Sequence, residues 1–192
     1  MKRLTCVLSG ATLALLLGTA PAYAQGAEFS LGGGVGLPLG DFDDAAKLGW
    51  HGLAGVSFVP ANSPVGFQID GQYHQYNLDE DVIGGGDLKD RLIFGTANAV
   101  YRFSTAEGTR FRPYLIGGGG VYNLKTTGDD DLGGVIDTDN SATKFGINAG
   151  AGFDVKAGNA GLFIEGRFHN VFTEGSNTTF IPITLGIRFG GS

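Results

Sequence analysis

The sequence predicts an all-β fold, an eight-stranded antiparallel up-and-down barrel that crosses a membrane, with short turns at one end and long loops at the other. Three observations predict this fold. Apolar and polar residues alternate with the period of two that a strand imposes. The alternation recurs in eight segments, and the connections between them alternate between short and long. Glycine is abundant, with 35 of 192 residues, while only 17% of residues are charged.

The N-terminus, which precedes the predicted strands, has the features of a secretory signal. Lys2 and Arg3 are followed by a short apolar core. Ala22, Tyr23 and Ala24 then form a small-x-small cleavage motif. An uncleaved anchor is the alternative, but the core is too short to be a good spanning helix. We therefore expect residues 1–24 to be removed on export and residues 25–192 to form the barrel domain. Cys6, the single cysteine, lies in the segment that is removed.

The direction of the alternation indicates that the barrel lies in a membrane. In residues 65–77, Phe67 and Ile69 alternate with Gln68 and Asp70. A narrow lumen holds the polar set when lipid surrounds the barrel, because the apolar set then faces acyl chains. Lipid also forbids an open sheet, whose edge amides would lack hydrogen-bond partners. The eight segments must therefore close on themselves.

The expected strands span ten to fourteen residues, long enough for a tilted strand to cross the apolar layer. In chain order they are residues 28–37, 50–59, 65–78, 91–103, 112–124, 143–156, 162–172 and 180–189. Tight turns are expected at 60–64 and 157–160 and a fairly short one at 104–110, whereas 38–49, 79–90, 125–142 and 173–179 are longer. This layout is typical of an outer-membrane barrel, whose short turns and termini lie at the periplasmic end.

Each expected strand has one lipid-facing side and one lumen-facing side. In chain order, the residues expected toward lipid include Phe29, Leu31, Val35, Trp50, Val56, Phe58, Phe67, Ile69, Tyr73, Ile93, Tyr101, Phe103, Phe145, Ile147, Phe153, Ile164, Phe168, Ile181, Ile183, Leu185, Ile187 and Phe189. Aromatic residues near the strand ends would form girdles at the two interfaces. The fifth strand is ambiguous, because Tyr114, Ile116 and Tyr122 compete with Leu115 and Val121 for the lipid face.

The lumen side carries balanced charge. Its acids are Glu28, Asp70, Asp154 and Glu165, and its bases are Arg102, Lys144, Arg167 and Arg188. Buried charges are costly unless paired, so we predict an ionic network in which Glu165 and Arg167 bond to groups on neighbouring strands. Hydrogen-bonding groups join it at Gln68, Gln72, Asn98, Asn148, His51, His74 and His169. Glycines would make room for the long Arg and Lys side chains at Gly34, Gly55, Gly146, Gly150, Gly152 and Gly186.

Catalytic and cofactor sites are not indicated by the motifs. Asp70, Glu165 and His169 could form an acid–base set, but ion pairs that fill a lumen explain the same residues better. The histidines lack a metal-ligand spacing, and there is no Gly-x-Ser-x-Gly elbow. The net charge of −6 argues against binding nucleic acid. We therefore expect neither catalysis nor a cofactor.

Three segments carry a family resemblance: residues 112–120, 162–168 and 183–189. With them, the chain resembles the small eight-stranded outer-membrane barrels of Gram-negative bacteria, the group of OmpX-like, OmpW-like and OmpA-barrel-like proteins. The resemblance implies a terminal assembly signal, formed here by Ile183, Leu185, Ile187 and Phe189 and read by the barrel-insertion machinery. Gly190, Gly191 and Ser192 follow where the family ends on an aromatic residue. Lipid A deacylases resemble this barrel too, but Val171 stands where they have a Ser after His169.

Acidic residues crowd two of the long loops. The residues that would gather a divalent cation, together with lipopolysaccharide phosphates, are Asp79, Asp81, Asp129, Asp130, Asp131, Asp137 and Asp139. Solvated loops without a bound ion are the alternative that the charge pattern favours.

These observations predict a monomeric protein of the outer membrane with a structural or surface-interaction role. Its expected partners are membrane lipid, lipopolysaccharide and, during insertion, the barrel-assembly machinery. A conduit for small apolar solutes, as in OmpW-like proteins, is the alternative. A lipid-modifying enzyme ranks third.

Overall fold

A computed structural model describes residues 26–40, 43, 47–60, 63–77, 88–106, 109–129, 135–136, 141–157, 160–173 and 177–190. Nearly all of them lie in strands. The strands are β1 (Ala27–Leu39), β2 (Gly49–Phe58), β3 (Val65–Asn77), β4 (Leu88–Arg102), β5 (Phe111–Asp129), β6 (Val135–Ile136), β7 (Ser141–Ala157), β8 (Ala160–Val171) and β9 (Thr178–Gly190). Among the described residues there is no helix with the length and hydropathy that would let it cross a membrane.

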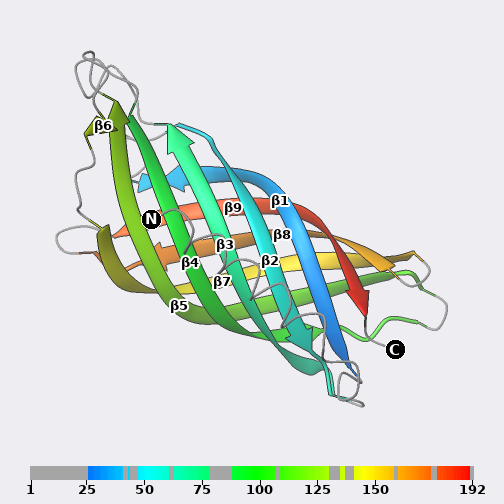
Figure 1. The fold of residues 1–192 in the computed structure, drawn as a ribbon. Coiled ribbons are helices and arrows are strands. Elements are labelled where there is room, and N and C mark those ends of the chain that lie inside the picture. Colours follow the sequence, from blue (N-terminus) through cyan, green and yellow to red (C-terminus); the bar gives the residue numbers. More distant parts are fainter. Residues whose placement is uncertain are drawn as a thin grey trace, which may run out of the picture.

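Eight of these strands form a closed antiparallel barrel (Figure 1). Strands β1 to β5 pair in sequence order, β5 pairs with β7, and β7, β8 and β9 continue the meander. Pairing of β9 with β1, from Glu28 opposite Gly190 to Leu39 opposite Thr179, closes the ring. The closed eight-stranded fold confirms the predicted fold class.

The main difference from the sequence prediction lies beyond the expected membrane layer. β5 runs on to Asp129 and β7 begins at Ser141, so both strands enter the segment expected to be a loop from residue 125 to 142. The two-residue strand β6 pairs with the end of β5 in the same segment. Outside the membrane a hairpin can continue without an apolar face, so the alternation that marked the other strands is absent there.

The outward side of the barrel carries the apolar side chains. Ile69, Phe145 and Leu185, for example, are 64%, 72% and 63% exposed, and Ile183, Ile187 and Phe189 lie on the same face of β9. The fifth expected strand is now resolved: Leu115 and Val121 face outward. Tyr114, Ile116 and Tyr122 are buried in the lumen, where they pack against other inward residues.

Glycines thin the wall where large inward side chains need space, but these are mainly rings. A Cβ at Gly152 would lie 2.5 Å from the Tyr114 ring, and one at Gly186 would lie 2.5 Å from the ring of Phe163. Gly146 is similarly close to Tyr122, and Gly150 alone of the six faces an arginine, Arg167. The expectation that these glycines accommodate Arg and Lys was therefore wrong for most of them, because aromatic rings also point into the lumen and need the same space.

Candidate functional site: the packed lumen

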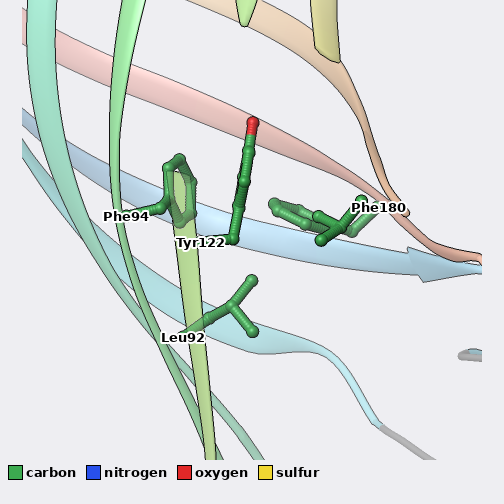
Figure 2. Packing of buried hydrophobic residues seen from close by; sticks show 5 residues of the cluster. Leu92, Phe94, Tyr122 and Phe180 are labelled. Atoms are coloured by element: carbon green, nitrogen blue, oxygen red, sulfur yellow. The ribbon is translucent and has the colours of Figure 1, made fainter. Parts of the chain in front are cut away.

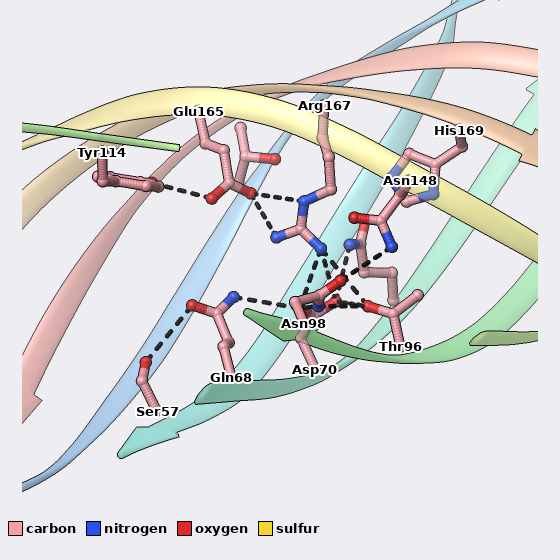
Figure 3. Close-up of polar contacts among 12 residues, drawn as sticks. Ser57, Gln68, Asp70, Thr96, Asn98, Tyr114, Asn148, Glu165, Arg167 and His169 are labelled. Carbon is pink, nitrogen blue, oxygen red and sulfur yellow. Dashed lines mark hydrogen bonds and ion pairs between the residues drawn. The ribbon is translucent and has the colours of Figure 1, made fainter. Parts of the chain in front are cut away.

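The middle of the lumen is occupied by the guanidinium of Arg167, which is 1% exposed. Its Nη1 lies 3.0 Å from Oδ2 of Asp70, and its Nη2 and Nε donate to Oε1 of Glu165. Figure 3 shows the side chain reaching from β8 across to the strands on the far side. On the neighbouring strand β7, the residue opposite Arg167 is Gly150, which has no side chain to accept a hydrogen bond. The second carboxylate partner of the guanidinium is therefore on β3. The prediction that Glu165 and Arg167 bond to neighbouring strands was wrong in this respect, since Asp70 on β3 bonds to Arg167 and Tyr114 on β5 bonds to Glu165, whereas β8 pairs with β7 and β9.

Asp70 is held by polar side chains from two strands. Gln72 and Gln68, on its own strand, donate to its carboxylate at 3.0 and 3.1 Å. From β4, Thr96 and Asn98 donate at 2.9 and 3.0 Å. A buried carboxylate is tolerated when its oxygens are paired in this way. The network extends to β5 and β7, since Tyr114 donates to Glu165 at 2.9 Å and Asn148 donates to Asn98 at 2.9 Å.

A second ionic group lies on the periplasmic side of this network. Arg188 forms an ion pair with Asp154 and donates to the Tyr114 hydroxyl at 3.1 Å. Its guanidinium carbon also lies 4.8 and 4.6 Å from the ring centres of Tyr114 and Phe163, which is cation–π geometry. Arg102 pairs with Glu28, and its Nε lies 4.0 Å from Asp154. These contacts link β1, β4, β5, β7, β8 and β9 near their periplasmic ends.

The extracellular half of the lumen is filled differently, by aromatic rings and histidines. Leu92, Phe94, Tyr122, Val171 and Phe180 form a buried cluster, most of which is drawn in Figure 2. The three lumen histidines stack on or against it: the His169 and Phe180 ring centres are 4.8 Å apart, and those of His51 and His74 are 4.6 Å apart. We call this set, with Tyr76, the aromatic–histidine layer.

Hydrogen bonds fix the histidines within this layer. Nδ1 of His169 bonds to the Tyr122 hydroxyl at 2.8 Å, and Nε2 of His51 bonds to Thr184 Oγ1 at 2.9 Å. His74 bonds through Nδ1 to the Tyr76 hydroxyl at 3.2 Å and through Nε2 to Gln72 at 3.0 Å. Because Gln72 also donates to Asp70, the aromatic–histidine layer is connected directly to the ionic network below it.

The sequence-predicted lumen residues fall into two sets. Six of the seven named residues meet in the ion pairs just described: Asp70, Arg102, Asp154, Glu165, Arg167 and Arg188. Lys144 lies nearer the extracellular end, half-buried and opposite Tyr122 in the register of β7 and β5, and takes part in none of those pairs. The loop residues Asp79, Asp81, Asp130, Asp131, Asp137 and Asp139 lie outside the described residues, as does the side chain of Asp129.

Sequence reasoning missed the aromatic–histidine layer as a unit. Leu92, Phe94 and Phe180 share the inward parity of their strands with residues that the sequence assigns to the lumen, such as Asn98 and Arg188. Parity is therefore the signal that identifies these three residues, although a lumen that is polar throughout would exclude them. Tyr122 lies on β5, where both faces are apolar or glycine, so parity does not identify it.

The geometry offers little to a hydrolase that acts on lipid. His169 is completely buried in the lumen, and Val171, two residues on, is buried beside it. Among the described residues, no group of three or more His, Cys, Asp or Glu side chains is placed to hold a metal ion. What the site does chemically is to satisfy buried charge and to fill the barrel.

Solved structures with the same fold cover nearly the whole barrel. Neisserial surface protein A has a TM-score of 0.60 and 17% identity, over 86% of this chain and 97% of that one. Ail of Yersinia pestis, solved with the heparin analogue sucrose octasulfate, has a TM-score of 0.54 and 16% identity, over 85% and 97%. The outer membrane enzyme PagL has a TM-score of 0.51 and 18% identity, over 85% and 99%. At these identities the likeness establishes the fold alone.

No curated protein matches the chain. The profile of a protein family does match: the outer membrane protein beta-barrel domain covers residues 10–189. This match takes in every strand described above, and the closed barrel with its apolar exterior is the structure that such a domain requires. The chain therefore belongs to the outer membrane protein beta-barrel family and is a protein of the outer membrane.

Proposed function

We propose that this protein is a closed, non-conducting barrel with a structural or surface-interaction role, acting as a monomer through its outer wall and its extracellular loops. The observation that carries the proposal is the double filling of the lumen. Arg167, Asp70 and Glu165 occupy the middle with at most 2% exposure, and His74, His169, Tyr122 and Phe180 are fully buried above them. An eight-stranded barrel is narrow enough for side chains to fill it, so two consecutive filled levels favour a plug over a pore.

Planar-bilayer recording tests this proposal. The refolded protein should give no discrete current steps, whereas a general porin measured in the same membrane should. A variant with Arg167→Ala, Glu165→Ala and Phe180→Ala, which removes two large side chains from the middle level and one ring from the level above, provides the matched comparison and should conduct if it folds. Stable stepwise conductance from the unmodified protein would contradict a closed barrel.

A conduit for small apolar solutes is the second candidate, and the apolar character of the extracellular half favours it. Leu92, Phe94 and Phe180 would line the entrance of such a route. Since apolar solutes carry no current, uptake of an apolar fluorescent dye by liposomes with and without the barrel is the appropriate measurement. Uptake that rises with barrel content and falls in Phe94→Asp would favour the conduit over the structural role.

Catalysis is not part of the proposal, although PagL shares the fold. The buried positions of His169 and Val171 support this view, since a lipid substrate reaches the barrel from outside. Mass analysis of lipid A from cells that express the protein tests it. A new deacylated species would overturn it.

The proposed partners are lipopolysaccharide in the membrane and the barrel-assembly machinery during insertion. The alternating strand β9, with Ile183, Leu185, Ile187 and Phe189 on its outer face, supports a role as the assembly signal.

Ail was solved with a polysulfated ligand, but the acidic loops of this chain would repel such an anion. We propose instead that the loop aspartates attract divalent cations, which calorimetry with calcium would test. An absence of binding heat would rule this out.

A further inference from the structure

The outer wall of the barrel is hollowed near its extracellular end. A shallow groove runs over β1 to β4, and its outward-facing walls are Leu31, Trp50, Tyr73 and Ile93. Trp50, Leu31 and Ile93 are each at least half exposed, so these walls stand out from the barrel toward lipid. The Trp50 and Tyr73 rings pack at 5.4 Å and form the end of the groove nearest the extracellular surface.

The floor of the groove is built from residues that lack large side chains. Gly52, Ala54 and Gly71 face outward between the larger neighbours. A Cβ at Gly52 would meet nothing within 4 Å, and one at Gly71 would meet only the Phe94 carbonyl oxygen at 3.9 Å. These glycines are therefore not required by close packing within the barrel. Their effect is to leave the shallow groove open on the lipid side.

Polarity changes in a definite order from the extracellular surface of the barrel into the groove. At the extracellular end, Tyr73 donates a hydrogen bond to Gln75 at 3.2 Å, and Gln75 lies opposite Arg91 in the register of β3 and β4. Arg91 is exposed on the same outer face as Ile93, and Lys125 lies opposite it in the register of β4 and β5. From the surface inward, the order is therefore cationic and polar, then aromatic, then apolar. An anionic amphiphile oriented as in the outer leaflet has the same order.

We propose that this groove holds one acyl chain of lipopolysaccharide, with a phosphate of its lipid A beside Arg91. The outer membrane location places the groove against hydrocarbon, and its extracellular end places it in the leaflet that lipopolysaccharide occupies. This site rests on the lipopolysaccharide partnership proposed above. It does not depend on whether the lumen is closed, because only the outer wall is involved.

The chain provides its own reporter, because Trp50 is its single tryptophan. The protein is refolded into nanodiscs of phosphatidylcholine with brominated acyl chains, which quench an exposed tryptophan. Unbrominated lipid A is then added in small amounts. A lipid A chain seated in the groove would displace brominated chains and restore Trp50 emission, saturating near one lipid A per barrel. Phosphatidylglycerol in equal amounts tests whether a phospholipid serves as well.

Two glycine variants make a matched pair. Gly52→Phe fills the floor of the groove, and Gly166→Phe adds the same side chain elsewhere on the outer wall, where a Cβ also meets nothing within 4 Å. The ring at position 52 occupies the space of the acyl chain, and inside a bilayer the contact that is lost is van der Waals packing rather than hydrophobic transfer from water. The midpoint of protection should shift by roughly tenfold in Gly52→Phe, which corresponds to the loss of about ten such atomic contacts. It should not shift in Gly166→Phe. Gly71→Leu is the second variant if Gly52→Phe does not fold.

Native mass spectrometry of the same samples gives a readout that is independent of fluorescence. The unmodified protein and Gly166→Phe should each retain one lipid A, and Gly52→Phe should retain none. Equal protection by phosphatidylglycerol, or an unchanged midpoint and retention in Gly52→Phe and Gly71→Leu, would overturn the proposal. Arg91→Gln should raise the midpoint about threefold, as loss of an exposed ion pair does, and no change there would remove the phosphate contact.

Discussion

The middle and the extracellular half of the lumen are equally buried but are filled by opposite chemistries. In the middle, Arg167 joins Asp70 and Glu165, and polar side chains from β3 and β4 complete the shell. In the extracellular half, Phe94, Tyr122 and Phe180 pack against hydrogen-bonded histidine rings. Burial alone therefore does not determine what fills a narrow barrel.

The difference teaches how each level would fail. The ionic level is a set of charges whose energies depend on one another, so removing one member leaves the others buried and uncompensated. The aromatic level depends on contact area, so removing one member leaves a cavity of limited size. The same depth of burial should therefore give different costs for truncation, and the following variants measure that difference.

The largest effect is expected for Arg167→Leu. Two carboxylates, Asp70 and Glu165, would lose their shared cation while remaining buried, which costs about 3–5 kcal/mol of unfolding free energy. Urea unfolding in phospholipid vesicles measures it, with Arg91→Leu on the exposed wall as the control. A change in Arg167→Leu no larger than that in Arg91→Leu would show that the ionic level does not stabilise the barrel.

Phe180→Ala is expected to rank second. Phe180 is fully buried and contacts Phe94, His74 and His169, so its truncation leaves a cavity and should cost about 3 kcal/mol. Phe168→Ala, which removes the same atoms from the lipid-facing side of β8, is the matched control and should cost less. The same unfolding assay compares the two. Equal losses would mean that the aromatic–histidine layer is loosely packed.

Most of the fold was predictable from the alternation of apolar and polar residues along the strands. Phe67 and Asp70 differ so much in polarity that their faces, and hence the closed barrel, followed from parity alone. The direction of Tyr114 and Ile116 could not be predicted in the same way, because both faces of β5 are apolar or glycine there. Only the packing partners, Val100 among them, show that this pair faces inward.

The candidate site was predictable in composition but not in pairing. The charge balance indicated that Arg167 would be paired, yet its contact with Asp70 joins residues 97 positions apart and depends on where ring closure places β3 and β8. Periodicity within a strand contains no information about which strands face each other across the lumen. That information comes from the number and register of all eight strands together.

A smaller effect is expected for Tyr122→Phe, which tests the hydrogen bond between an aromatic residue and a histidine in the aromatic–histidine layer. The ring stays in place, while the hydroxyl that bonds to His169 Nδ1 is removed. The loss of one buried hydrogen bond costs about 1 kcal/mol. Thermal unfolding in detergent, followed by the mobility shift between boiled and unboiled samples, measures it. A loss of stability as large as that in Phe180→Ala would show that this hydrogen bond contributes as much to stability as the packing of a whole ring.

The smallest effect is expected at the periplasmic rim, for Glu28→Gln. Its partner Arg102 is 11% exposed and Glu28 is 20% exposed, so water compensates part of the lost attraction, unlike at Arg167. Arg102 also keeps Asp154 as a neighbour at 4.0 Å. A cost of about 0.5–1 kcal/mol is expected, and high salt should shrink it because partly exposed pairs are screened. Urea unfolding at low and high salt measures both. If Glu28→Gln cost as much as Arg167→Leu and were insensitive to salt, the ionic network would behave as one unit from the rim to the centre, and the contrast between exposed and buried pairs would not hold.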